Sequence, residues 1–147
     1  MRVPPPPQRL AELPYWAYHP LGIERSRAET VRRACTRASG LARLGCSEPG
    51  VVHRSLQSIG GVGPWTAAEV AAVALGDPDA VSVGDYHLPH VVAWALAGEP
   101  RGDDERMLAL LEPYRGQRAR VLRLITSAGL GPPRHAPRAR LRAIERI

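Results

Sequence analysis

The stretch "SIGGVGPWTAAEV", residues 58–70, constrains the fold of this chain more than any other segment. It places three glycines and a proline directly before an alanine-rich run. Pro64 suits the first position of a helix, where its fixed φ helps and its missing N–H is not needed. Glycine allows a tight turn and lets another group approach the backbone. With a preceding helix that ends near Gln57, the stretch predicts a helix-hairpin-helix.

Prolines and glycines divide the rest of the chain into further helices. We expect helices over 25–39, 49–56 and 64–75, a helix from near Tyr86 to Ala97, a short one in "DDERMLALLEPY", and one over 117–128. Residues 1–8 are expected to be extended, "LPYWAYHPLGIE" to form a turn, and "DAVSV" is the single weak strand candidate. The pattern predicts an all-α helical bundle with a lead segment over 1–20, a helical domain over 21–130 and a basic tail over 131–147.

A chain of 147 residues with 44% hydrophobic residues is expected to form about one domain with its own core. The sequence contains no run of about 18 apolar residues, the length that spans a bilayer. Its first ten residues also lack the apolar stretch of a signal peptide. We therefore expect a cytoplasmic protein without a membrane partner. Cys35 and Cys46 are too few for a four-thiolate site and are expected to be reduced.

The net charge of +6 comes from the last third of the chain, where arginines outnumber acids. Such a basic segment is typical of a protein that binds a polyanion, and a solvated helix face with a loose tail explains it equally well. Every basic residue other than histidine is arginine. Without a lysine amine, this chain cannot form a Schiff base through lysine.

The glycine turn is a candidate phosphate site. Gly61 and Gly63 leave backbone amides uncovered, and the helix that begins at Pro64 directs its positive end the same way. The backbone amides of Thr66 and Ala67 are further candidate donors to the same phosphate. A phosphate held there would position DNA without reading its bases. An ordinary tight corner between two helices is the alternative.

Two segments together resemble a known family. "IGGVGPWTAAEV" followed by "VSVGDYHLPH" resembles the hairpin and the catalytic-aspartate segment of the helix-hairpin-helix (HhH-GPD) DNA glycosylases, and is closest to the DNA-3-methyladenine glycosylase II family. "LGIERSRAETVRRA" and "EPYRGQRARVLRLI" extend the likeness over 21–130. It implies a monomeric, cofactor-free enzyme of base excision repair that hydrolyses the N-glycosidic bond of alkylated purines in damaged double-stranded DNA, at the nucleoid.

The resemblance assigns the catalytic carboxylate to Asp85, which could stabilise positive charge on the sugar and orient a water. A helix cap is the alternative role for this aspartate, and the two roles are compatible. Trp65 stands where bifunctional relatives have a Schiff-base lysine, so a hydrolysis without strand cleavage is expected. Trp65, Tyr86, Tyr15 and Trp16 are the candidates for the base pocket.

Three further predictions concern charge and metals. Arg115, Arg118 and Arg120 are candidates for salt-sensitive DNA contacts. By resemblance, main-chain carbonyls of Gln57, Ile59 and Val62 would hold a monovalent cation. His87 and His90 form D-x-H-x-x-H with Asp85, and we interpret them as packing or DNA-facing groups in preference to metal ligands.

Two departures from the family bear on activity. Gly60 stands where relatives have a proline, and relatives carry a further N-terminal half that completes the DNA cleft. The sequence is therefore also compatible with a catalytically inactive helix-hairpin-helix DNA-binding protein. A protein-interaction module whose glycines merely turn a corner is the third interpretation.

Overall fold

The computed structural model describes residues 3–133. Every regular element in that part of the chain is helical, which confirms the all-α prediction; "DAVSV" is irregular and forms no strand. None of these helices is long and apolar enough to cross a membrane. Most of the predicted basic tail, 134–147, lies outside the described residues.

The N-terminal segment differs from its prediction at 7–8. Residues 3–6 form no helix, as expected, but α1 (Pro7–Glu12) then begins, since Pro7 fits a first helical position and the residues after it favour helix. The expected turn is a 3-10 helix, η1 (Tyr15–Leu21). Tyr18 is 4% exposed and its hydroxyl donates to the Leu10 carbonyl at 2.7 Å. The lead segment is therefore anchored to the fold, and it packs on α2 (Arg25–Thr36).

Helix α2 stops three residues before its predicted end. The Thr36 hydroxyl donates to the Arg33 carbonyl at 2.7 Å, an acceptor that the helix itself would use, and Arg37 leaves helical geometry with φ −103°. Two short elements follow, α3 (Ala38–Ala42) and the 3-10 helix η2 (Arg43–Cys46). The chain then turns into the hairpin.

The hairpin consists of α4 (Pro49–Gln57) and α5 (Pro64–Ala74), within one residue of the predicted ends. Its core is made of small and branched side chains of both helices, with Ala80 from the following loop: Val52, Leu56, Ala67, Ala68 and Ala71. Alanines on α5 bring the two helices close, as their spacing predicts. The predicted helix-hairpin-helix is therefore present.

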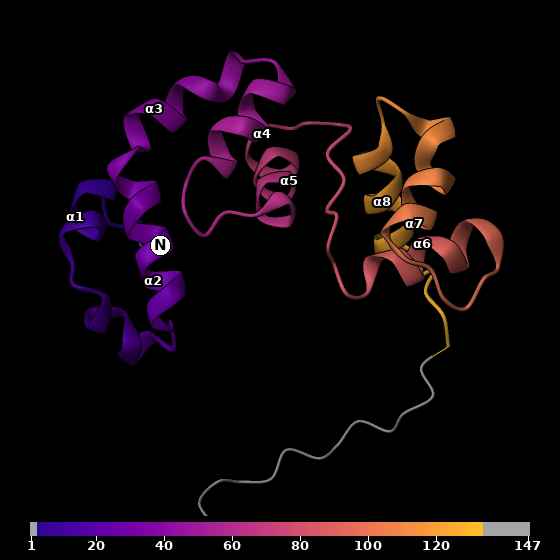
Figure 1. The fold of residues 1–147 in the computed structure, drawn as a ribbon, viewed down its shortest axis with the longest axis horizontal. Helices are drawn as coiled ribbons and strands as arrows, with labels where there is room; N and C mark the ends of the chain where they lie inside the picture. The colour runs from indigo at the N-terminus through magenta and orange to yellow at the C-terminus, as the bar shows by residue number, and fades with distance from the viewer. Residues whose placement is uncertain (1–2, 134–147) are drawn as a thin grey trace, which may run out of the picture.

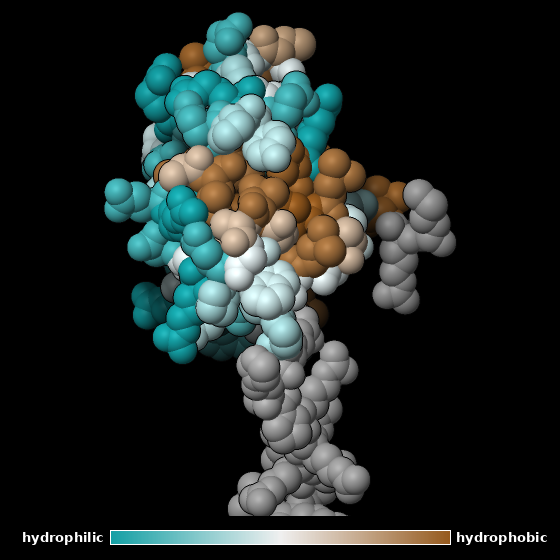
Figure 2. All heavy atoms as spheres, turned by 90° about the vertical axis from the view of Figure 1, so that its right-hand side faces the viewer, coloured by the Kyte–Doolittle hydropathy of each residue, from teal (hydrophilic) through white to brown (hydrophobic). Residues whose placement is uncertain are grey.

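The second half contains α6 (Leu88–Ala97), α7 (Asp104–Leu111), the 3-10 helix η3 (Glu112–Tyr114) and α8 (Arg118–Ser127). Val92, Met107, Leu111 and Leu122 form its core. Figure 1 shows this half beside the hairpin, with the α5–α6 loop running between them. Figure 2 shows its outer face, where apolar side chains gather in the middle. Leu124 and Leu130, in α8 and shortly after it, are among the exposed large apolar side chains of the protein.

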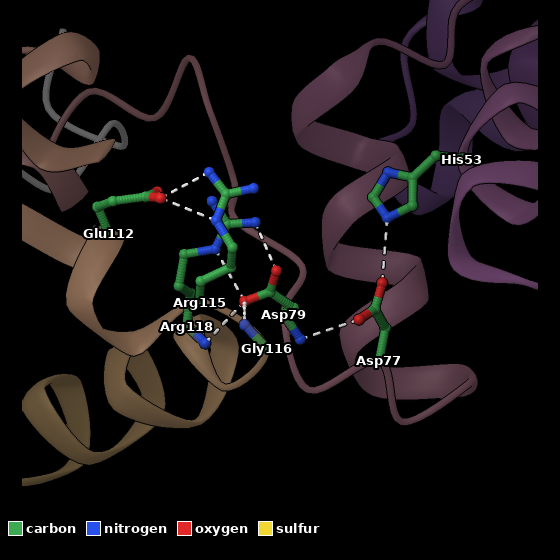
Figure 3. A network of polar contacts seen from close by, with 7 residues as sticks. All are labelled: His53, Asp77, Asp79, Glu112, Arg115, Gly116 and Arg118. Atoms are coloured by element: carbon green, nitrogen blue, oxygen red, sulfur yellow. Dashed lines mark hydrogen bonds and ion pairs between the residues drawn. The ribbon is translucent and has the colours of Figure 1, made fainter. Parts of the chain in front are cut away.

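A polar network joins the two halves (Figure 3). Asp79, in the α5–α6 loop, accepts the N–H groups of Gly116 at 2.7 Å and Arg118 at 3.1 Å, and its carboxylate also pairs with the Arg118 guanidinium. Asp77 contacts His53 of α4 at 3.3 Å and accepts the Asp79 N–H. The Arg118 hydrogen bond holds the pKa of Asp79 at about 2. The loop that leads to Asp85 is thus fixed to both α4 and α8.

Candidate functional site

Asp85 connects the first turn of α5 to the start of α6. One carboxylate oxygen, Oδ1, accepts the N–H groups of His87 at 2.7 Å and Leu88 at 2.8 Å. The other oxygen, Oδ2, accepts the indole N–H of Trp65 at 3.0 Å. Asp85 therefore binds the start of the helix, as its alternative role predicts, although α6 begins at Leu88 with His87 as its N-cap residue. Because the side chain is only half-buried, the cap leaves the carboxylate within reach of a ligand.

The surroundings of Asp85 favour its ionised form. Burial raises the pKa of this carboxyl, but the hydrogen bonds from Leu88, His87 and Trp65 outweigh burial and hold the pKa below its usual value. The carboxylate is therefore negatively charged at neutral pH. Such a fixed charge can stabilise a cation that develops beside it.

Gly84 and Asp104 orient the backbone that carries Asp85, and the sequence reasoning did not identify either residue. Gly84 has φ +88°, a conformation that glycine adopts readily. Its N–H donates to Asp104 Oδ2, on the first turn of α7, at 3.0 Å. A glycine directly before the aspartate was the available signal for the first residue. No sequence signal connects Asp104 to a position 20 residues earlier.

Two of the four aromatic candidates lie beside Asp85. Trp65 is bonded to it and is 43% exposed, and Tyr86 follows it in the chain and is 81% exposed. Tyr86 contacts the rings of His87 and His90 edge-on. An exposed indole and an exposed phenol next to a carboxylate offer flat apolar surfaces on which a base could stack.

Tyr15 and Trp16 are not brought to this place. They belong to η1, which Figure 1 shows at the α1 and α2 end of the molecule, opposite α6. Their rings meet edge-to-face at 5.4 Å, and the Arg25 guanidinium lies 4.6 Å from the centre of the Tyr15 ring. Tyr15 therefore serves the contact between η1 and α2, whereas Trp16 is 62% exposed and packs on Tyr15.

The structure of the hairpin turn supports some of the predicted phosphate-binding residues and excludes others. Gly61 has φ +96°, and a Cβ there would lie 2.0 Å from Thr30 Oγ1, so its missing side chain lets the turn rest on α2. A Cβ on Gly63 would meet open space. The Ala67 N–H donates to the Gly63 carbonyl at 3.0 Å and is therefore not a phosphate donor, contrary to prediction. Gly63, the N-cap of α5, makes no side-chain cap, and the amide of Thr66 in the first turn stays a candidate phosphate donor.

The three candidate arginines differ in their partners. Arg118 is held by Asp79, so its charge is compensated and it joins two parts of the fold instead of facing DNA as predicted. Arg115 pairs with Glu112 at 2.7 Å on the surface. Arg120 is exposed, and within residues 3–133 it forms no ion pair. Of the three, Arg120 is the one whose charge is uncompensated.

His90 has a structural contact, because its Nδ1 accepts the Gly102 N–H at 3.1 Å. Within residues 3–133, no group of three His, Cys, Asp or Glu side chains is arranged to hold a metal. Cys35 and Cys46 are free cysteines in the structure.

The cation implied by resemblance would rest on carbonyls of the turn. The Ile59 carbonyl accepts the Val62 N–H at 2.9 Å, and a carbonyl oxygen has a second lone pair for an ion. Neutral main-chain oxygens suit a hard cation. Gln57, Ile59 and Val62 therefore fit such an ion chemically.

Comparison with protein-family models and with curated proteins gives no match. Among solved structures, the chain is similar to a DNA-3-methyladenine glycosidase from Bacillus halodurans, with a TM-score of 0.68 and 27% identity. The similarity covers 83% of this chain. The fold is that of a helix-hairpin-helix DNA glycosylase. This glycosylase-like chain spans 58% of the length of that neighbour.

Proposed function

We propose that this chain is a monofunctional DNA N-glycosylase that removes alkylated purines of the 3-methyladenine type from double-stranded DNA. The observation that carries the proposal is the Asp85 carboxylate, ionised and held between Trp65 and the start of α6. It lies one hydrogen bond from the first turn of the hairpin helix, the segment that would hold the DNA backbone. The solved neighbour's name supports the same substrate class.

The chemistry follows from charge. Breaking the bond between base and deoxyribose builds positive charge on the sugar, and a carboxylate beside C1′ stabilises it and orients a water for attack. An alkylated purine already carries positive charge and leaves readily, so little acid assistance is needed. Trp65 and Tyr86 would offer stacking surfaces to the extruded base. A cation on the carbonyls of Gln57, Ile59 and Val62 would only shape the turn.

The sequence contains no lysine, which determines the nucleophile that attacks the sugar. Trp65 occupies the hairpin position from which a lysine would attack the sugar, and an indole cannot form an imine with it. Water is therefore the nucleophile, and the product is an intact abasic strand. A DNA-binding protein without catalysis is the second candidate, because the hairpin could hold a DNA backbone whether or not Asp85 is catalytic.

The test is release of methylated purines from alkylated duplex DNA, measured by chromatography of the free bases. The wild type is expected to release 3-methyladenine and to leave strands that break only after alkali. Asp85→Asn is expected to reduce the rate at least a hundredfold, in the range of lost electrostatic catalysis.

Glu105→Gln is the matched control, because Glu105 is an exposed carboxylate on the first turn of α7. It should release base at the wild-type rate. Thermal unfolding of each variant separates lost chemistry from lost fold. Wild-type protein that binds duplex DNA and releases no base would refute catalysis and leave the binding function.

A further inference from the structure

Two arginines hold the hairpin turn, Arg33 on α2 and Arg37 directly after its last residue. Arg33 donates through Nη1 to the Gly60 carbonyl at 3.0 Å. Arg37, one helical turn further on, donates through Nη1 to the Ser58 carbonyl at 3.1 Å and to its hydroxyl at 2.9 Å. Both side chains are exposed. The two guanidinium groups are therefore fixed along the outer edge of the turn.

The charges of these two arginines are not compensated by acids. On the same helix, Arg27 pairs with Glu24 and Arg32 pairs with Glu29. In the described chain, 3–133, the ion pairs include neither Arg33 nor Arg37. A carbonyl acceptor fixes a guanidinium without cancelling its charge. Because a guanidinium has five N–H donors, each arginine keeps donors for another acceptor.

A groove of about 540 Å³ lies beside this edge. It is lined by residues of α2 and by one residue of the turn: Arg25, Ser26, Glu29, Thr30, Arg33 and Gly61. The acid in this set, Glu29, is engaged by Arg32, which leaves the positive charges of Arg25 and Arg33 in excess. The groove is therefore an electropositive hollow that begins at the turn.

Gly61 joins this groove to the candidate phosphate site. It lines the groove, rests against Thr30 of α2 and lies two residues before Gly63, where α5 begins with an uncapped N-terminus. The positive end of the α5 dipole and the two arginines thus act on adjoining surface. A chain of regularly spaced phosphates matches such a row, whereas a single small anion would use one part of it.

We infer that Arg33 and Arg37 form a second phosphate contact for the DNA strand held by the hairpin, with the groove along α2, which Arg33 lines, as the path of the strand beyond the turn. The inference rests on the proposed function and extends its DNA-binding surface onto α2. The contact is sequence-independent, because it involves backbone phosphates. The carbonyl bonds hold both guanidinium groups in place before DNA arrives, which lowers the entropy lost on binding.

The experiment measures binding of an undamaged mixed-sequence duplex across a sodium chloride series, for wild type, Arg33→Gln, Arg37→Gln and the double variant. Glutamine keeps an N–H donor for the turn carbonyl and removes the charge. The plot of log K against log salt has a negative slope. Each substitution is expected to make this slope less negative by about 1, and the double variant by about 2. Arg27→Gln, whose charge is already paired with Glu24, should leave the slope near the wild-type value.

A lysine pair, Arg33→Lys with Arg37→Lys, distinguishes charge from fold. It should restore most of the slope, since lysine also binds phosphate as a point charge. Thermal unfolding of the double glutamine variant reports any loss of the turn. An unchanged slope in a folded double variant overturns this inference alone. If the wild type binds no duplex at all, the proposed function is overturned as well. If the wild type releases no base but the salt slopes change as expected, only the proposed catalytic activity is overturned.

Discussion

At the scale of single residues, Trp65 has a role that could not be predicted from its position in the sequence. It donates its indole N–H to Asp85 Oδ2, while the backbone of α6 binds the other oxygen. The carboxylate is therefore fixed from two sides, and its charge is favoured by all three donors. Removing one donor should alter both its direction and its pKa.

Trp65→Phe keeps an aromatic ring and loses the N–H. The pKa of Asp85 is depressed in the folded protein, so loss of a donor raises it toward its ordinary value. The acidic limb of the pH profile for base release should then shift to higher pH, with a rate loss of roughly tenfold at neutral pH. The measurement is base release from alkylated DNA between pH 3 and pH 8.

Trp16→Phe serves as the control, because Trp16 is an exposed indole on η1, away from Asp85. Its profile should match that of the wild type. Identical acidic limbs for Trp65→Phe and wild type would show that the indole does not hold the carboxylate.

At the scale of elements, the hairpin turn uses its glycines for different purposes. Gly61 has positive φ and rests on Thr30 of α2, whereas Gly63 has φ −88° and faces open space. The first glycine is needed for folding. The second is free to serve the approach of a ligand.

Gly61→Ala and Gly63→Ala form a matched pair. Alanine at Gly61 meets Thr30 and a strained backbone, so the free energy of unfolding should fall by about 1–3 kcal/mol. At Gly63, the N-cap of α5, the new methyl group meets open space but alanine is a poorer N-cap than glycine, so the fall should be smaller, at about 0.5–1 kcal/mol. Urea denaturation measures both.

DNA affinity completes the comparison, since a methyl group on Gly63 would obstruct a phosphate that approaches the α5 N-terminus. Gly63→Ala should therefore bind duplex DNA several-fold more weakly while it remains folded. Full affinity in this variant would place the phosphate elsewhere on the turn.

At the scale of the whole molecule, the position of Asp85 relative to the hairpin depends on how the two halves join. The Asp79 carboxylate accepts main-chain and side-chain donors of the α8 start, and neighbouring Asp77 contacts α4. Asp77 thus fixes the start of the α5–α6 loop to α4, and the Asp79 bonds fix it to the start of α8. Their strength therefore depends on the ionisation of Asp79.

Asp79→Asn tests this junction. The pKa of Asp79 falls from 3.8 to about 2 on folding, chiefly through Arg118. That difference corresponds to about 2 kcal/mol of stability, present above the unfolded pKa and lost as the pH falls from about 4 to about 2. Urea denaturation should show wild type more stable than Asp79→Asn by this amount at pH 7, with the gap closing toward pH 2. A gap that persists at pH 2 would assign the stability to something other than the charge.

The sequence by itself determined the local structure. Pro49 and Pro64 start helices α4 and α5, and alanine spacing on α5 produces the close hairpin, because these effects depend on φ restriction, missing donors and side-chain size at neighbouring positions. The likeness of "GVGPWTAAEV" and "VSVGDYHLPH" to one family led to the fold that the solved neighbour bears out.

Only the tertiary structure decided which groups meet. The Trp65–Asp85 bond spans 20 residues, and the Asp79–Arg118 pair spans 39. Arg33 on α2 and Arg37 directly after it reach a turn more than 20 residues away. These contacts depend on how helices pack against one another, so no short-range pattern in the sequence encodes them. Tertiary packing therefore decided whether the charge of each arginine is paired with an acid, as in Arg118, or is uncompensated, as in Arg33 and Arg37.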